Sequence, residues 1–350
     1  MKRWVLGALG VAVVAAAAQP IRPAAARDYM WIVSSSASEP FTNAVARRAA
    51  RAAGARAPIV ENTGTAIALA HLCAGSGPEH PDAASVTRRL RKAELDVCRR
   101  NGVAELVEVP VGLDMLVVAQ AKAGPVRALT SQQMFVALAR LLPDETGALA
   151  PNPHRKWSEV DRALPDTRID LRVLPGQSDS REALQDLILH KGAQGNPAIA
   201  RRWPGGAVPG ALRLMRDDHP FVTLHVTEEE IARELVAHPG ALGVFGYRFL
   251  EANRAHLRGL PVDGAEPTPE NAYAGRYPGT RKLYLYVNRS RLDAVRGLRR
   301  IGSEHLSSTA LGADGYLLAM GFVPLGIEDM MKAFALVETM PPLRRETLPE

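Results

Sequence analysis

Short apolar runs and amphipathic segments alternate along most of the chain, and a polar turn joins each run to the segment after it. The clearest example begins at residues 169–174, an apolar run that is typical of a strand. Apolar positions then recur over residues 183–188 with the 3.6-residue period of a helix. This pattern predicts a strand, a short turn and a helix, in that order.

The turn of this unit carries hydroxyl and charged side chains. Ser178 and Ser180 stand beside Arg181 at the expected start of the helix. Unpaired backbone N–H groups at a helix start, together with hydroxyls and a guanidinium, make a site for a small oxyanion. An ordinary helix start is the alternative, with Asp179 as its N-cap and Glu182 completing a capping box. The turn alone does not decide between these two interpretations.

The same unit recurs in the first hundred residues. A strand at 29–34 leads through a serine-rich turn into a helix at 41–53. A second short strand at 58–61 leads through a polar turn into an apolar helix that begins beside Thr65. The Thr65 hydroxyl either caps this helix or faces a ligand.

A further polar segment, residues 82–89, precedes a helix expected at 92–101. Its side chains include Thr87 and Arg88, which could face the same ligand as the turns before it. Most surface arginines are simply solvated, and Arg88 and Arg89 could be solvated in the same way.

Capping residues place several later elements. Thr130 is a candidate N-cap for a helix that runs to residue 142, and Thr227 begins a capping box for a helix that ends near His238. A turn is expected at Gly112-Leu113-Asp114, between two strands. The later strands are expected at residues 105–109, 115–120, 240–247 and 283–287.

Alternating strands and helices predict an α/β protein with mainly parallel sheets. At 350 residues the chain is long enough for two lobes, each with its own core. Ligands of open α/β sheets bind in crevices beyond the strand ends, so turns from two facing lobes can form one site.

The N-terminus has the features of a secretory signal peptide. Lys2 and Arg3 precede an apolar run at residues 4–18, and three alanines at 24–26 offer a cleavage site. The apolar run is shorter than the roughly 20 residues of a membrane span, although an uncleaved anchor is an alternative. We therefore expect an exported, periplasmic protein that loses residues 1–26.

The charge of the chain is only mildly basic. Loss of Lys2, Arg3 and Arg22 with the signal, and of no acidic residue, lowers the formal charge from +6 to +3. The remaining basic residues are spread along the chain and aromatic residues are scarce, which argues against a nucleic-acid partner. A mild positive charge suits an anionic ligand.

The chain has two cysteines, Cys73 and Cys98. In an exported protein an isolated pair most simply forms one disulfide, here closing a loop of about 26 residues. A metal site would need further cysteine or histidine ligands nearby, and the spacing shows none. We expect a disulfide and no metal.

These segments, taken in order, resemble the periplasmic phosphate-binding proteins that supply ABC importers and have the type 2 periplasmic binding protein fold. The resemblance runs from Arg27 to about Leu325. No single segment is decisive, but seven in the same order form a specific match. The matching segments are residues 32–42, 61–75, 82–90 with Cys98, 107–120, 152–160, 173–184 and 239–250.

The resemblance implies a two-lobed α/β fold with mixed, mainly parallel sheets and a ligand cleft between the lobes. It implies lobe 1 at residues 27–112, lobe 2 at 113–240, a return to lobe 1 at 241–340, and a loose tail at 341–350. Carried over by position, the ligand-binding residues are Ala37 and Ser38 through their backbone, Thr65, Thr87, Arg88, Ser178, Asp179, Ser180 and Arg181.

Three departures from the family pattern affect the ligand site. Ala37 stands where the family usually has threonine, and Ala66-Ile67-Ala68 stands where it usually has glycines. Asp179 replaces the glycine of a Ser-Gly-Thr loop. An unprotonated carboxylate there would take up donors and repel an anion, or it would instead accept the proton of a protonated ligand.

The family implies a periplasmic solute-binding protein that captures phosphate or a related oxyanion and passes it to an ABC permease in the inner membrane. It implies a monomer without a cofactor. The alternative is a degenerate relative that binds another ligand or a protein partner and has no transport role. An enzyme is not expected, because the histidines are scattered and no Gly-x-Ser-x-Gly motif is present.

Overall fold

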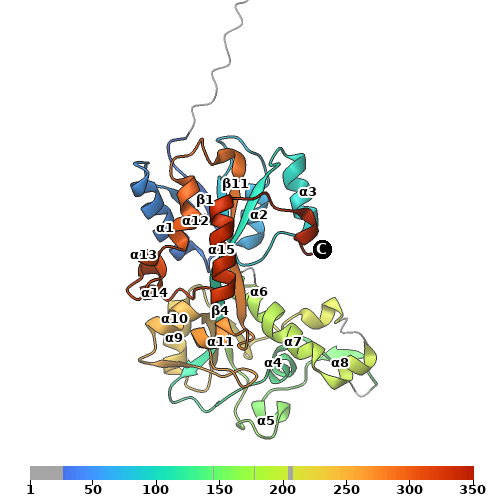
Figure 1. Cartoon of the computed structure of the whole chain (residues 1–350). Coiled ribbons are helices and arrows are strands. Elements are labelled where there is room, and N and C mark those ends of the chain that lie inside the picture. Colours follow the sequence, from blue (N-terminus) through green and yellow to red (C-terminus); the bar gives the residue numbers. More distant parts are fainter. Residues whose placement is uncertain (1–26, 145, 177, 204–207) are drawn as a thin grey trace, which may run out of the picture.

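The computed structural model describes residues 27–144, 146–176, 178–203 and 208–350, and the expected signal peptide lies outside them. The described chain forms two lobes, one above the other in Figure 1. A nine-stranded sheet runs through both lobes. Eight of its strands pair in the order β2-β1-β3-β11-β4-β9-β7-β8, and β10 pairs with β4 beside this path. No helix within the described ranges is long and apolar enough to cross a membrane.

The sheet of the upper lobe, lobe 1, contains the first strands of the chain. β1 pairs in parallel with both β2 and β3, and β3 pairs with β11 in the antiparallel sense. Helices α1, α2 and α3 follow these strands, so the repeated strand–turn–helix pattern is confirmed. The bounds are β1 (Trp31–Ser34), α1 (Glu39–Ala52), β2 (Ile59–Asn62), α2 (Thr65–Leu72), β3 (Ala83–Val86), α3 (Lys92–Arg100) and β11 (Thr280–Asn288).

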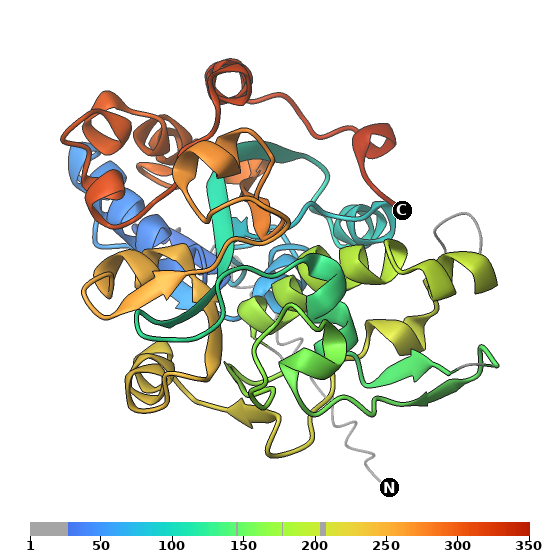
Figure 2. The same ribbon diagram turned by 90° about the horizontal axis from the view of Figure 1, so that it is seen from below.

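The sheet of the lower lobe, lobe 2, contains two parallel pairs, β7 with β8 and β7 with β9. A separate hairpin of β5 and β6 projects from this lobe (Figure 2). Helix α9 begins after Thr227 and ends before His238, as expected. The bounds are β5 (Leu141–Pro143), β6 (Leu149–Pro151), β7 (Leu171–Val173), β8 (Val222–Leu224), α9 (Glu228–Ala237), β9 (Leu242–Gly246), α10 (Tyr247–Ala252) and β10 (Leu257–Gly259).

A single long strand, β4 (Leu106–Ala121), connects the lobes where two strands and a turn were expected. Its first half pairs with β11 in lobe 1 and its second half with β9 in lobe 2. A side chain at position 112 would clash with the ring of Phe322, since a Cβ placed there would lie 2.1 Å from Phe322 Cζ. Pairing with a partner far along the chain overrides the local turn signal of Gly112-Leu113-Asp114.

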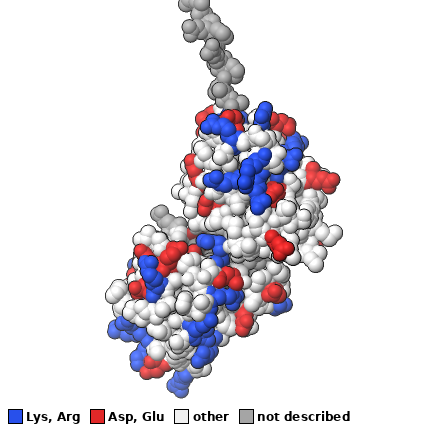
Figure 3. Space-filling model, turned by 90° about the vertical axis from the view of Figure 1, so that its left-hand side faces the viewer, with Lys and Arg blue, Asp and Glu red and all other residues white. Residues whose placement is uncertain are grey.

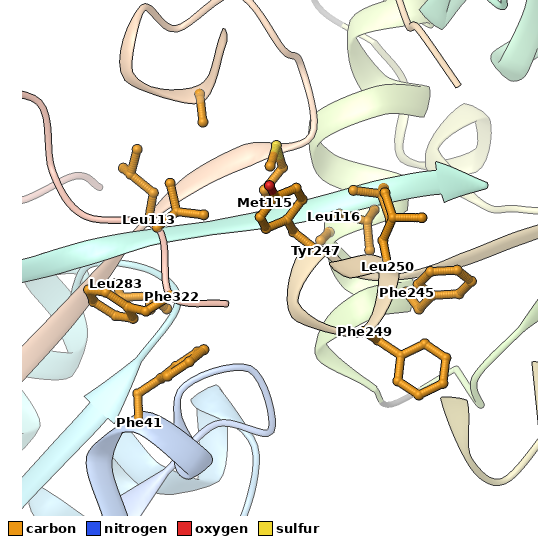
Figure 4. Packing of buried hydrophobic residues seen from close by; sticks show 14 of the residues in the cluster. Phe41, Leu113, Met115, Leu116, Phe245, Tyr247, Phe249, Leu250, Leu283 and Phe322 are labelled. Atoms are coloured by element: carbon orange, nitrogen blue, oxygen red, sulfur yellow. The ribbon is translucent and has the colours of Figure 1, made fainter. Parts of the chain in front are cut away.

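The pairing of β9 also moves the lobe boundary. β9 and β10 both pair with β4 in the lower lobe, so the chain returns to lobe 1 in β11 and not at residue 241. Buried side chains line the junction on both sides of β4 (Figure 4). On the lobe 1 side, Phe41 and Phe322 pack edge to face with ring centroids 4.9 Å apart.

The expected disulfide is present between Cys73 and Cys98. It joins the end of α2 to α3, on the face of the lobe 1 sheet that these two helices cover. The second hydrophobic cluster of this lobe packs around it, with Leu69, Leu72 and Leu95 fully buried.

The C-terminal segment is ordered, contrary to the loose tail expected at residues 341–350. Leu348 is buried, Leu343 N–H donates to the carbonyl of Leu106, and Lys92 N–H donates to that of Pro349. Arg345 forms an ion pair with Asp96 of α3 at 2.9 Å. Backbone hydrogen bonds to β4 and α3 therefore hold a segment whose composition alone is typical of a loose end.

A buried histidine in lobe 1 predicts a loss of stability in acid. His305 is fully buried at the end of α12 (Ile301–His305), and neither ring nitrogen has a partner among the described residues. Burial lowers the pKa of His305 to about 3. Below the ordinary histidine pKa of about 6.5, the unfolded state binds this proton and the folded state does not.

We therefore expect His305 to lower the free energy of unfolding as pH falls from about 6.5, by at most about 1.4 kcal/mol per pH unit. Urea unfolding at a series of pH values measures the slope. His305→Leu should flatten it, and His71→Leu, at an exposed histidine, serves as the control. An unchanged slope in His305→Leu would assign the acid sensitivity to other groups.

Candidate functional site

The polar turns of lobe 1 meet at one edge of its sheet. β2, β1 and β3 are parallel neighbours, so their carboxyl ends lie side by side and lead into the turns at Ser36, Thr65 and Thr87. The start of α6 (Asp179–Ala183), from lobe 2, lies against these turns. Strand ends of one lobe and a helix start of the other therefore form a common site.

The side chain at the centre of this site is the carboxylate of Asp179. Its Oδ2 accepts from Ser36 N–H at 2.7 Å and from the Ser36 hydroxyl at 2.6 Å. Its Oδ1 accepts from the Thr65 hydroxyl at 3.2 Å. Asp179 is only 4% exposed, so these donors have replaced most of its water. We call Ser36, Thr65 and Thr87 the donor nest.

The hydroxyls of the nest are oriented by the charge that they face. Thr65 Oγ1 and Thr87 Oγ1 lie 2.9 Å apart, and either could donate. A carboxylate only accepts, so the single proton of Thr65 is directed at Asp179 and Thr87 must donate to Thr65. Thr87 N–H also donates to Thr65 Oγ1, at 3.3 Å. Both threonines therefore contribute to one chain of hydrogen bonds that points at an anion.

The N-cap of α6 is Ser178, not Asp179. The Ser178 hydroxyl accepts from Arg181 N–H at 3.2 Å and donates to the Pro175 carbonyl at 2.8 Å. The alternative interpretation of this turn, a capping box with Asp179 as N-cap and Glu182, is therefore wrong. Asp179 is the first residue of the helix, and its carboxylate is available to the opposite lobe because Ser178 satisfies the helix start.

An ion pair between β11 and the connecting strand β4 lies on the backbone side of Asp179. Arg281 of β11 donates through Nε to Asp114 Oδ2 of β4 at 2.9 Å. Its Nη2 donates to the backbone carbonyl of Asp179 at 3.2 Å. Both side chains are largely buried, so this pair fixes the start of α6 against the connecting strands.

The structure does not bring every predicted site residue into the nest. Arg88 forms two hydrogen bonds with Glu94, at 2.7 and 2.9 Å, and this bonding raises the pKa of Arg88. Ser38 is buried and donates to the Ser85 carbonyl at 2.7 Å. Arg181 is 7% exposed, and burial lowers its pKa while Asp217 opposes that shift. Among the described residues, the buried Nε of Arg181 has no hydrogen-bond partner.

A cavity of about 340 Å³ opens between the lobes beside the nest. Ser36, Ala37 and Ser180 line one side of it, and Glu228 and Arg248 belong to its lobe 2 wall. Burial raises the pKa of Glu228, which accepts from Gly246 N–H at 3.0 Å. Ala37 and Ser180 therefore lie beside a space that a small solute could enter.

Sequence reasoning missed Ser36, Arg281 and Asp114. Ser36 lies in the serine-rich turn that was singled out, but only the path of the backbone shows which of its residues faces the nest. Arg281 and Asp114 carry no local signal, because their pairing depends on the register of β11 against β4.

Charges on the outer surface do not single out another site on the face that Figure 3 shows. Basic and acidic side chains are interspersed there on both lobes, with one group of Lys and Arg on the upper lobe. No cluster of three or more potential metal ligands occurs within the described ranges.

Comparison with known proteins agrees with this architecture. The model of a PBP superfamily domain matches residues 22–300. Protein SphX of Synechococcus elongatus is 27% identical over 289 residues, which are 80% of this chain and 74% of SphX.

Two solved structures show the same fold. One is described as a possible phosphate binding protein from Planctomyces limnophilus, at 20% identity and a TM-score of 0.61, covering 89% of this chain and 98% of that one. The other is an ABC-type phosphate transport receptor from Vibrio cholerae, at 15% identity and a TM-score of 0.60, covering 84% and 99%. The two-lobed α/β fold expected from the sequence is confirmed.

Proposed function

Since the chain belongs to the PBP superfamily, we propose that it is a solute-binding protein that captures phosphate or a related oxyanion for an ABC importer. In this proposal residues 1–26 direct export, and the monomer binds its solute in the periplasm and delivers it to a permease in the inner membrane. The relatives support the ligand class, because one matching structure is described as a possible phosphate binding protein and another as an ABC-type phosphate transport receptor. No chemical step is required.

The observation that carries the proposal is that the donor nest already holds a negatively charged group, the carboxylate of Asp179. Two hydroxyls and a backbone N–H from separate strand ends converge on the carboxylate oxygens of Asp179. Oxyanions of phosphate type need the same donors, since their oxygens accept hydrogen bonds as carboxylate oxygens do. The nest is therefore suited to an anion, and the adjoining cavity offers a route to it.

One observation favours the alternative, a degenerate relative that binds another ligand or a protein partner. The donors of the nest are engaged by the protein's own carboxylate, and Ala37 adds no hydroxyl to them. If this arrangement persists whenever solute is present, the cleft cannot accept an oxyanion at these donors.

Thermal unfolding in the presence of anions tests the proposal. A solute at 100 times its dissociation constant should stabilise the folded protein by about 2.7 kcal/mol. Phosphate, arsenate, sulfate and a phosphonate should be compared at equal ionic strength, with chloride as the control. We expect phosphate or another member of the series to raise Tm, and no response to any of them would favour the degenerate relative.

A further inference from the structure

We propose that Asp179 is an internal ligand of the oxyanion site, so that its carboxylate holds the two lobes together without solute and any solute must displace it. This inference deepens the proposed function, on which its competition with phosphate rests. It makes Asp179 the residue that sets the affinity of the cleft. The closing of the lobes by Asp179 does not depend on which solute the protein carries.

The contacts of Asp179 cross from one lobe to the other. Ser36 and Thr65 belong to lobe 1, whereas Asp179 begins a helix of lobe 2, at separations of 143 and 114 residues along the chain. An oxyanion in a cleft of this kind joins the lobes by accepting hydrogen bonds from both. Here a side chain of one lobe occupies the donors of the other, so closure needs no added molecule.

The carboxylate and an oxyanion cannot share these donors. Oδ2 takes both the N–H and the hydroxyl of Ser36, and Oδ1 takes the only proton of Thr65. An anion placed at the same groups would lie against the carboxylate and be repelled by it. Arg281 does not relieve this repulsion, because it is engaged by Asp114 and by the Asp179 carbonyl.

The helix can release the carboxylate without losing its own structure. Ser178 caps α6, and the backbone carbonyl of Asp179 is held by Arg281, so neither contact uses the Asp179 side chain. The cavity of about 340 Å³ beside Ser36 and Ser180 provides space in which the carboxylate can leave the nest and an oxyanion can enter. The Asp179 side chain is therefore not the cap of α6, and it can leave the nest while the helix stays capped.

The decisive variant is Asp179→Ala, with Asp179→Asn as a second variant that keeps the shape of the side chain. Glu182→Gln is the matched control, because it removes a negative charge from the same helical turn, whereas the Ser36 and Thr65 donors bond to Asp179. Small-angle X-ray scattering without and with inorganic phosphate measures closure, and isothermal titration measures the phosphate affinity. Circular dichroism checks that each variant is folded.

We expect the wild type and Glu182→Gln to be compact without phosphate. Asp179→Ala should have a larger radius of gyration that shrinks when phosphate is added, and should bind phosphate at least about tenfold more tightly. Asp179→Asn should lie between them. An Asp179→Ala protein that is as compact as the wild type, or that binds phosphate more weakly, would overturn the proposal. If Asp179→Ala opens but no protein binds phosphate, the internal ligand stands and phosphate as the solute is excluded.

Discussion

Replacing Asp82 by alanine is expected to lower the free energy of unfolding by about 3–5 kcal/mol, the usual cost of removing one partner from a buried ion pair. Asp82 is fully buried between two arginines of lobe 1. Its Oδ1 accepts from Arg27 at 2.9 Å and from Arg291 at 3.1 Å, and its Oδ2 accepts from Trp31 N–H at 2.9 Å. The variant leaves two largely buried guanidinium groups without this carboxylate.

Urea unfolding of Asp82→Ala and of the wild type gives this difference directly. Asp293→Ala is the matched control, since Asp293 is exposed and its ion pair with Arg299 lies at the surface, where such pairs contribute little. A change in Asp82→Ala no larger than in the control would contradict the role of this network in lobe 1.

In the Asp179→Ala background, replacing Thr65 by valine is expected to weaken oxyanion binding by about 10- to 100-fold, which corresponds to about 1–3 kcal/mol. Valine keeps the shape of the side chain but removes the hydroxyl that donates to the anion. It also removes the acceptor for the hydroxyl and the N–H of Thr87, which are buried. An unpaired buried donor costs more than the hydrogen bond alone.

Isothermal titration with phosphate measures this loss in the Asp179→Ala background, where no internal carboxylate uses the Thr65 hydroxyl. Thr309→Val, the same substitution at an exposed site in lobe 1, is the control. If Thr65→Val and the control bind phosphate equally well, Thr65 does not belong to the ligand site.

Local pattern predicted most of the elements of this fold. The alternation of apolar runs with helical segments and the caps at Thr130 and Thr227 are confirmed by the structure. The main error was at β4, where Gly112-Leu113-Asp114 has the composition of a turn but pairs with β11, beside a shift of register between Leu283 and Tyr284. The C-terminal tail was a second error, because its order depends on β4 and α3 and not on its own residues.

The sequence predicts which chain segments form the site, but not which side chains pair there. The turns that carry Thr65, Thr87 and Asp179 were identified, and the structure brings these three side chains together. The partners of Asp179 could not be predicted, because they come from the other lobe and depend on how the lobes close. Arg88 is a different case, because its partner Glu94 lies only six residues further along in lobe 1 and takes up its guanidinium in an ion pair.

We propose that this protein binds its anionic solute in the donor nest at Ser36, Thr65 and Thr87. The most direct test is a crystal structure of Asp179→Ala grown with phosphate. We expect one phosphate ion in the place of the carboxylate, with phosphate oxygens about 2.7–3.2 Å from the backbone nitrogen of Ser36 and from Thr65 Oγ1. A nest that stays empty under these conditions, or a phosphate bound elsewhere in the cleft, would contradict it.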